Sequence, residues 1–428
     1  MSRETEPPRP RSQRSTKLDV PKYRPTEYKH AHDSRGEIKE DDFFKGVVDI
    51  DQELSSSLSE ADITRDELLR NEEKVIPLSK LEVKKGIEYI SDREKRGMYS
   101  SLDDFKKDDE FPLESSVIES DKNHAKDLKE EFDKNDENNF REEMFEGLMV
   151  EDLQMQNWFG NNVEVFPTTK YDDYTNGVDL VMEWENESEE PVRLAVDVTV
   201  GMTKETLLKK LDSNDSNSAI LEQLEDPETR GGEPYYMSQV KYYEVFDGLE
   251  ENKKSLNQIP RVVLALDKKG VRFLMEDLYD KNDEDEFSFN RAKAEVHPAQ
   301  IVLLEEARNQ LREQLIVSLS NDFTEIISGA LTPEQIDAFT EVDLDMGRDK
   351  LDSLAKEVLK LLESLSLDLN PKERNQVKMI KQIAENIDNL NKILENKKTH
   401  LDISDDEVGK WRTEDRNAHA LIERYHIE

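Results

Sequence analysis

Two short apolar segments separated by a polar turn are the feature that most restricts how this chain folds. Residues 179–184 (DLVMEW) alternate, residues 193–200 (RLAVDVTV) are almost continuously apolar, and the polar stretch 186–190 lies between them. Such runs, bounded by turn residues, predict two strands that pair as an antiparallel hairpin. Asp197 interrupts the second strand in a stretch apolar enough to be central in a sheet, where an unpaired charge is costly. We therefore expect Asp197 to have a specific partner.

Flanking segments indicate that this hairpin belongs to an α/β domain that spans about residues 137–298. Apolar residues recur at helical spacing from Phe140 to Trp158, and Gly160 follows as a stop signal. Further elements are predicted as a strand at 163–166, helices at 203–211, 218–224 and 237–249, and a buried strand at 261–266 (RVVLAL). Helix, strands, helices and strand in this order are typical of an α/β sandwich.

The C-terminal part, residues 299–428, has only helical patterns. Apolar periodicity and cap residues predict helices at 301–319, 332–339, 351–365 and 377–394. The last two are separated by Asn370-Pro371, a break that favours an antiparallel helical hairpin. We expect the apolar stripes of this helical module to form a core. The alternative is that they close a dimer, which would make the protein a homo-oligomer.

The N-terminal part, residues 1–136, is predicted to be a mostly disordered, charged tail. Of all 428 residues 37% are charged and only 35% hydrophobic, so that part of the length buries little apolar surface. Short apolar islands such as 43–48 and 75–78 interrupt the polar background. These islands are either transient helices or linear motifs that dock on a partner.

Composition also limits the compartment. The chain has no Cys, which excludes disulfides and thiolate sites. No apolar run approaches the roughly 20 residues that a membrane span needs, and residues 1–14 lack the apolar region of a secretory signal. We therefore expect a cytoplasmic protein that does not enter a membrane.

The net charge is strongly negative. The formal value is −39 at pH 7, although residues 1–36 carry nine Lys and Arg against five Asp and Glu. A polyanion repels nucleic acid at long range and lacks the counterion release that drives most non-specific DNA binding. The charge therefore favours basic protein partners and argues against DNA as a partner.

Asp179 and Asp197 are the candidate functional pair. Asp179 opens the first strand of the hairpin, so the two carboxylates can lie side by side on one face. Adjacent half-buried carboxylates repel unless a cation lies between them, and Mg²⁺ prefers such hard oxygen ligands. An alternative for Asp179 is turn chemistry after Asn176-Gly177. Asp172 and Asp173 are either outer acids of the same site or solvated loop residues.

The segments GVDLV (177–181) and AVDVT (195–199) resemble the two signature strands of the PD-(D/E)xK nuclease superfamily. The resemblance implies a restriction-endonuclease-like α/β core that binds Mg²⁺ or Mn²⁺ and hydrolyses phosphodiester bonds in DNA. It implies that Asp179 and Asp197 are metal ligands and that a glutamate on the preceding helix completes the site. Glu146 matches that glutamate best, and Glu143 is the second choice.

The sequence departs from the family where the family has a lysine that orients the attacking water. Thr199 stands at that position, so the motif reads D-x-T. The resemblance also extends to Gln239 and Tyr243, which match a Q-x-x-x-Y helix motif of the exonuclease branch and would bind substrate. Lys241 lies between them and is the replacement that we expect for the catalytic lysine, whereas Lys204 lies past the strand end.

Two function classes therefore stay open. One is an active Mg²⁺-dependent nuclease. The other is a catalytically inactive relative that acts as an acidic protein-interaction module. The chain has no P-loop, no G-x-G-x-x-G and no G-x-S-x-G sequence, which disfavours the nucleotide-binding and hydrolase classes that these motifs define.

Overall fold

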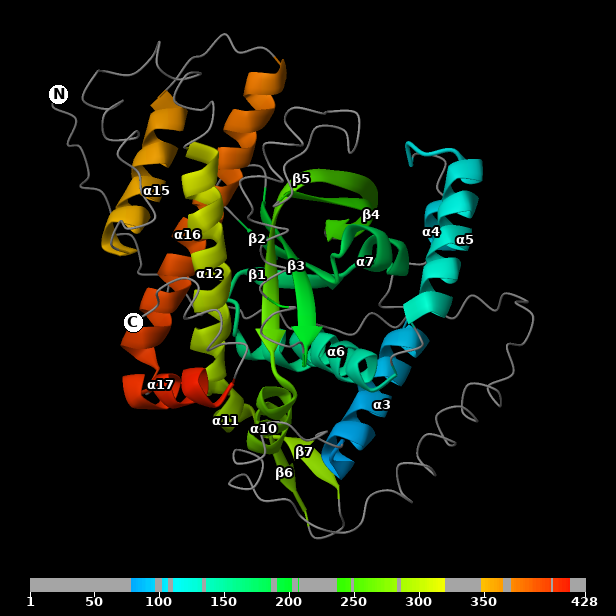
Figure 1. Cartoon of the computed structure of the whole chain (residues 1–428), viewed down its shortest axis with the longest axis vertical. Coiled ribbons are helices and arrows are strands. Elements are labelled where there is room, and N and C mark those ends of the chain that lie inside the picture. Colours follow the sequence, from blue (N-terminus) through cyan, green and yellow to red (C-terminus); the bar gives the residue numbers. More distant parts are fainter. Residues whose placement is uncertain are drawn as a thin grey trace, which may run out of the picture. The chain divides into compact units, whose positions relative to one another are not determined.

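A mixed sheet, formed by five strands among the described residues, lies at the centre of the fold (Figure 1). Its order is β1-β2-β3-β5-β4. The strands are β1 (Val163–Pro167), β2 (Leu180–Trp184), β3 (Val192–Val200), β4 (Met237–Asp247) and β5 (Glu250–Leu266). The pairs β1–β2, β2–β3 and β4–β5 are antiparallel, and β3–β5 is parallel. The predicted hairpin is thus confirmed as β2–β3, and the predicted α/β class is confirmed as a mixed sheet with helices.

The computed structural model describes part of the chain. The described residues are 78–96, 102–106, 111–132, 136–185, 191–201, 207, 237–247, 250–282, 286–319, 348–364, 371–401 and 403–415. All of them belong to one unit, residues 61–428. The helices predicted at 218–224 and 332–339 lie outside the described residues, as does all but residue 207 of the helix predicted at 203–211.

The segment predicted as a helix at 237–249 is the strand β4, so that prediction is wrong. Its sequence, MSQVKYYEVFD, is rich in β-branched and aromatic residues that favour pleated, half-buried surfaces. Val240 and Tyr243 are buried against residues of β2, β3 and β5. β5 is also longer than the predicted strand 261–266: its first part pairs with β4 and its last six residues pair with β3.

The helix that precedes the sheet is shorter than predicted. α6 runs over Asp136–Leu148 and continues as a π turn (Met149–Leu153) and a 3-10 turn (Gln154–Gln156). Asn157 then adopts the left-handed conformation, φ 58°, which ends the helical path before Trp158. The Trp158 indole is fully buried and donates to the Ala294 carbonyl at 2.8 Å. The apolar spacing found in the sequence therefore spans three kinds of helical turn.

The C-terminal helices pack on the sheet. α12 (Ala299–Ser318) and α16 (Pro371–His400) contact each other and β5, and α15 (Arg348–Ser364) packs on α16. The predicted apolar stripes are buried, among them Leu354 and Val358 on α15 and Ile380, Ile387 and Leu390 on α16. One hydrophobic cluster includes side chains of these helices and of strands β1, β2, β3 and β5, so the helices and the sheet share a core.

Smaller elements complete the described fold. They are α7 (Lys170–Asn176), α10 (Lys268–Leu278), β6 (Tyr279–Lys281), β7 (Phe287–Phe289), α11 (Arg291–Glu295) and α17 (Asp405–Glu414). β6 and β7 form a separate antiparallel pair. No helix in the described part of the chain is long and apolar enough to span a membrane.

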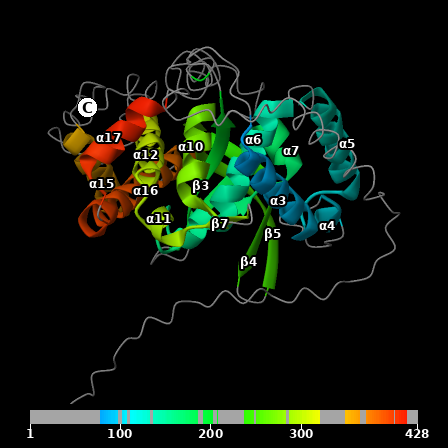
Figure 2. The same ribbon diagram turned by 90° about the horizontal axis from the view of Figure 1, so that it is seen from below.

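Three helices precede α6, in the part predicted to be disordered. They are α3 (Lys80–Arg96), α4 (Leu102–Lys106) and α5 (Ser115–Phe132). In Figures 1 and 2 they lie across the sheet from α12, α15 and α16. Phe105, Phe111 and Ile118 are buried together with Tyr242 of β4, and Glu82 forms a fully buried ion pair with Arg141 at 2.8 Å. The expectation of a tail without a packed core is therefore wrong for these helices, while residues 1–77 lie outside the described residues.

Candidate functional site

The β2–β3 register brings Asp179 and Asp197 together. Leu180 pairs with Val196, so one residue further along the ladder Asp179 lies opposite Asp197. Both residues are buried, with relative exposures of 8% and 4%. The Asp179 carboxylate accepts the backbone N–H of Val198 at 2.6 Å. Asp179 is thus tied to the strand that carries Asp197.

Burial and three neighbouring acids raise the pKa of the Asp179 carboxyl. Burial is the largest cause that raises the pKa of its carboxyl well above the ordinary value. The negative charges of Asp173, Glu146 and Asp197 raise this pKa further, in that order. A side-chain interaction with Asp173 raises this pKa as well. These four acids come from α7, α6, the start of β2 and the middle of β3.

Arg261 supplies a positive charge to this cluster. It lies at the point where β5 begins to pair with β3, opposite Ala195. Its guanidinium forms an ion pair with the Asp197 carboxylate, and its Nη1 donates to the Asn176 carbonyl at 3.4 Å. Asp197 therefore has the partner that its place in an apolar strand required, and that partner is a protein cation.

The three glutamates at the end of α6 have different neighbours. Glu146, the residue expected to complete the site, is buried, and its negative charge raises the pKa of Asp179. Glu142 accepts the Val200 backbone N–H at 3.0 Å and the Thr199 hydroxyl at 3.2 Å. Glu143, the second choice, lies 3.6 Å from the Lys170 ammonium. Thr199, which stands where the family has lysine, is thus bound to an acid of α6.

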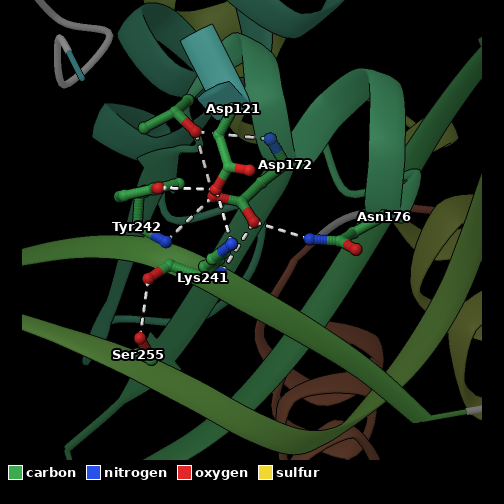
Figure 3. A network of polar contacts seen from close by, with 7 residues as sticks. Asp121, Asp172, Asn176, Lys241, Tyr242 and Ser255 are labelled. Atoms are coloured by element: carbon green, nitrogen blue, oxygen red, sulfur yellow. Dashed lines mark hydrogen bonds and ion pairs between the residues drawn. The ribbon is translucent and has the colours of Figure 1, made fainter. Parts of the chain in front are cut away.

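Asp172 lies in a separate polar network (Figure 3). It has no exposed surface, and its carboxylate accepts the backbone N–H groups of Lys241 at 2.7 Å and Tyr242 at 3.0 Å. The hydroxyl of Thr169 and the amide of Asn176 donate to it as well. Burial raises the pKa of Asp172, and these hydrogen bonds oppose that shift. Asp172 is therefore neither a solvated loop residue nor part of the cluster around Asp179.

Lys241 is placed by the same network (Figure 3). It lies on strand β4, not on the helix that was expected, and its ammonium contacts the Asp121 carboxylate of α5 at 2.5 Å. The ammonium also lies 5.2 Å from the centre of the Tyr171 ring. Its neighbours therefore differ from those of Asp179 and Asp197.

The other two residues of the Q-x-x-x-Y match lie in different surroundings. Gln239 is exposed on β4, whereas Tyr243 is buried and its hydroxyl donates to Glu183 at 2.9 Å. Because β4 is a strand with register shifts next to Val240, the four-residue spacing does not give the common face that a helix would.

The sequence pointed to Asp179, Asp197 and Glu146, and to Asp173 as one of two alternatives for an outer acid, but it did not point to Arg261. The sequence did contain a signal for Arg261, because it is the single charge at the start of the apolar run RVVLAL. Such a charge next to a buried strand needs an opposite partner, and Asp197 lies in the other strand of this kind.

The donor set has the chemistry that Mg²⁺ and Mn²⁺ prefer, since it consists of carboxylate oxygens. Within the described ranges, however, no three Asp, Glu or His side chains are arranged as ligands of one metal ion. The contacts of Asp197 with Arg261 and of Asp179 with Val198 account for this, because each turns a carboxylate toward a protein donor.

No protein-family model, curated protein or solved structure matches this chain significantly. A functional proposal for this chain therefore depends on the arrangement of its side chains.

Proposed function

We propose that the cluster of Asp179, Asp197 and Glu146 is a divalent-cation site in a nuclease-like domain of residues 137–298. The observation that carries the proposal is the convergence of these three acids from β2, β3 and α6. They are the positions at which the resemblance to the PD-(D/E)xK superfamily places metal ligands. The element order of helix, antiparallel hairpin and a later strand parallel to β3 also supports the resemblance.

The electrostatics support a cation at this place. Four acids act on one another where burial already disfavours their charged forms. In the described structure Arg261 pairs with Asp197, and Lys170 pairs with Asp173 at 3.0 Å. Protons or a divalent ion can supply the remaining positive charge. When bound, Mg²⁺ would polarise a phosphoryl oxygen and lower the pKa of a bound water. Asp179 and Asp197 would hold the ion, and Glu146 would complete its ligands or accept a proton from the water.

A second candidate is an acidic protein-interaction module that keeps this fold without catalysis. Thr199 is uncharged and bonds to Glu142, and the ammonium of Lys241 pairs with Asp121 of α5. Neither residue therefore supplies a positive charge beside the acids. The net charge of −39 favours a basic protein partner over DNA.

Thermal unfolding with and without Mg²⁺ or Mn²⁺ tests the site. A ligand at a hundred times its dissociation constant stabilises the folded state by about 2.7 kcal/mol. Asp179→Asn and Asp197→Asn should each abolish this gain, whereas Glu305→Gln, which changes a buried acid of α12, should keep it. Cleavage of DNA at low salt, measured on the same proteins, separates the active enzyme from the binding module. A wild-type protein that no divalent ion stabilises would refute the metal site.

A further inference from the structure

The guanidinium of Arg261 lies between the acid cluster and the end of α7. One edge pairs with the Asp197 carboxylate, and Nη1 reaches the Asn176 carbonyl in the last turn of the helix. Gly177, with φ 61°, follows directly, and a Cβ atom at this position would lie 2.7 Å from Nη2. The glycine therefore leaves the space in which the guanidinium sits.

We infer that Arg261 is a tethered cation in the carboxylate site, and that a divalent ion binds in competition with its guanidinium. This inference rests on the proposed metal site and adds its regulation. It explains why the acids converge while no three of the described ones are arranged as metal ligands. With Arg261 in place, Asp197 is directed at a protein cation and is not open to an ion.

The charge of Arg261 is permanent, so the competition does not depend on its protonation. The carboxylate of Asp197 can face either the guanidinium or a metal ion. Removing one partner of a buried ion pair leaves the other charge uncompensated, which costs free energy. A metal ion that takes Asp197 must therefore offset the loss of this ion pair. The apparent affinity of the site for the ion is lowered by that amount.

The hydrogen bonding of Arg261 is incomplete, which fits a displaceable group. Its Nε is buried and has no hydrogen-bond partner. A guanidinium that serves only as a structural cross-link usually has its N–H groups paired, because an unpaired buried donor is costly. The position of Arg261 is thus held by charge more than by a full set of hydrogen bonds.

The variant Arg261→Gln in the full chain tests the inference, with Arg193→Gln as the matched control. Arg193 lies on β3, pairs with Glu183 at 2.6 Å, and its side chain has the same 15% exposure as that of Arg261. The readouts are the melting temperature as a function of Mn²⁺ concentration and the Mn²⁺ affinity from titration calorimetry. Both are measured after treatment with a chelator and dialysis.

We expect Arg261→Gln to melt below the wild type without metal and to bind Mn²⁺ at least tenfold more tightly. Arg193→Gln should lower the melting temperature without changing Mn²⁺ affinity. Arg261→Lys keeps the charge and should keep an affinity close to that of the wild type. If Arg261→Gln does not fold, Gly177→Ala, which crowds the guanidinium, takes its place as the variant expected to bind Mn²⁺ more tightly. Arg261→Lys then remains the variant expected to bind like the wild type.

The outcomes separate this inference from the proposed function. Equal Mn²⁺ affinity in the wild type and in Arg261→Gln would overturn the competition and leave the metal site standing. Binding that appears only in Arg261→Gln would support exclusion of the ion by Arg261 and would refute the metal site proposed for the wild-type protein. Absence of binding in both proteins would remove the metal site itself, and the inference with it.

Discussion

The side-chain amide of Gln310 on α12 makes both backbone hydrogen bonds of Val263 on the outer edge of β5. It accepts the Val263 N–H at 2.8 Å and donates to the Val263 carbonyl at 2.6 Å. One helical turn later, Gln314 donates to the Arg261 carbonyl at 2.7 Å. Four residues of helix advance about 6 Å and two residues of strand about 6.6 Å, so the two spacings match. The helix thereby covers a strand edge that β4, which pairs only as far as Pro260, leaves open.

Gln310→Ala should destabilise the fold by about 2–6 kcal/mol. It leaves a buried N–H and a buried carbonyl of Val263 without partners, and each such group costs about 1–3 kcal/mol. Urea unfolding monitored by circular dichroism measures the change. Gln376→Ala on α16, at a half-buried position, is the control and should stay within about 0.5 kcal/mol. Similar small values for both variants would contradict the role of Gln310 at the strand edge.

Gly177→Ala and Gly201→Ala should have similar backbone costs but different effects on the metal site. Both glycines have positive φ, 61° and 72°, which costs another residue about 1 kcal/mol. A Cβ at 177 meets the guanidinium of Arg261, whereas a Cβ at 201 meets the aliphatic stem of Lys268. Only Gly177→Ala should therefore lower the Mn²⁺ concentration needed for half of the stabilisation. Calorimetric titration of both variants measures this, and equal shifts would argue against crowding at Arg261.

Lys241→Met should loosen α5 without disturbing β3. The change removes the ammonium that pairs with Asp121, a contact whose side chains are only 20% and 14% exposed. Hydrogen exchange should become faster over residues 115–132. Lys122→Met removes an exposed pair with Asp103 and should leave exchange in α5 nearly unchanged, since such pairs contribute little. If Lys241→Met instead abolished DNA cleavage while α5 kept its protection, Lys241 would be the catalytic lysine that the sequence suggested.

Lys397 should make the stability rise with pH between about 8 and 10.5. Its buried ammonium donates to the Asn157 carbonyl at 2.8 Å and to Gln300 Oε1 at 2.5 Å, and burial lowers its pKa from 10.5 to about 8. Between these values the unfolded chain holds the proton that the folded chain releases, so raising the pH favours the folded state. Below pH 8 both states are protonated and the full cost of the buried charge applies.

Comparison of the wild type with Lys397→Met isolates this group. The stability of the wild type relative to the variant should increase by up to about 3 kcal/mol from pH 7 to pH 10.5. Urea unfolding at pH 7, 8.5 and 10 measures the difference, and other titrating groups cancel in it. Parallel pH profiles for the two proteins would show that Lys397 keeps an ordinary pKa.

Local patterns were sufficient to predict the elements whose burial follows from their own sequence. The strands at 163–166, 179–184 and 193–200 and the helices at 301–319 and 351–365 were predicted because their apolar residues repeat with the period of the element. The pairing of Asp179 with Asp197 followed from the predicted hairpin, because only a short polar segment joins its two strands.

What the sequence did not reveal depends on contacts between distant segments. β4 was read as a helix because the spacing of Gln239 and Tyr243 suggested one, whereas its conformation is fixed by pairing with β5. Arg261 lies 64 residues from Asp197, and only the parallel pairing of β3 with β5 brings them together. The burial of α3, α4 and α5 depends on surfaces of α6, α7 and β4 that their own weakly apolar sequences do not indicate.

The Asp172 carboxylate holds strand β4 through two of its backbone amides. Lys241 and Tyr242 are fixed to a carboxylate at the start of α7, some 70 residues earlier, at the point where the β4 ladder shifts register. The place of β4 therefore does not depend on the length of the connection, residues 202–236. We expect homologous chains to differ in length there more than elsewhere, provided that they keep an acid in place of Asp172.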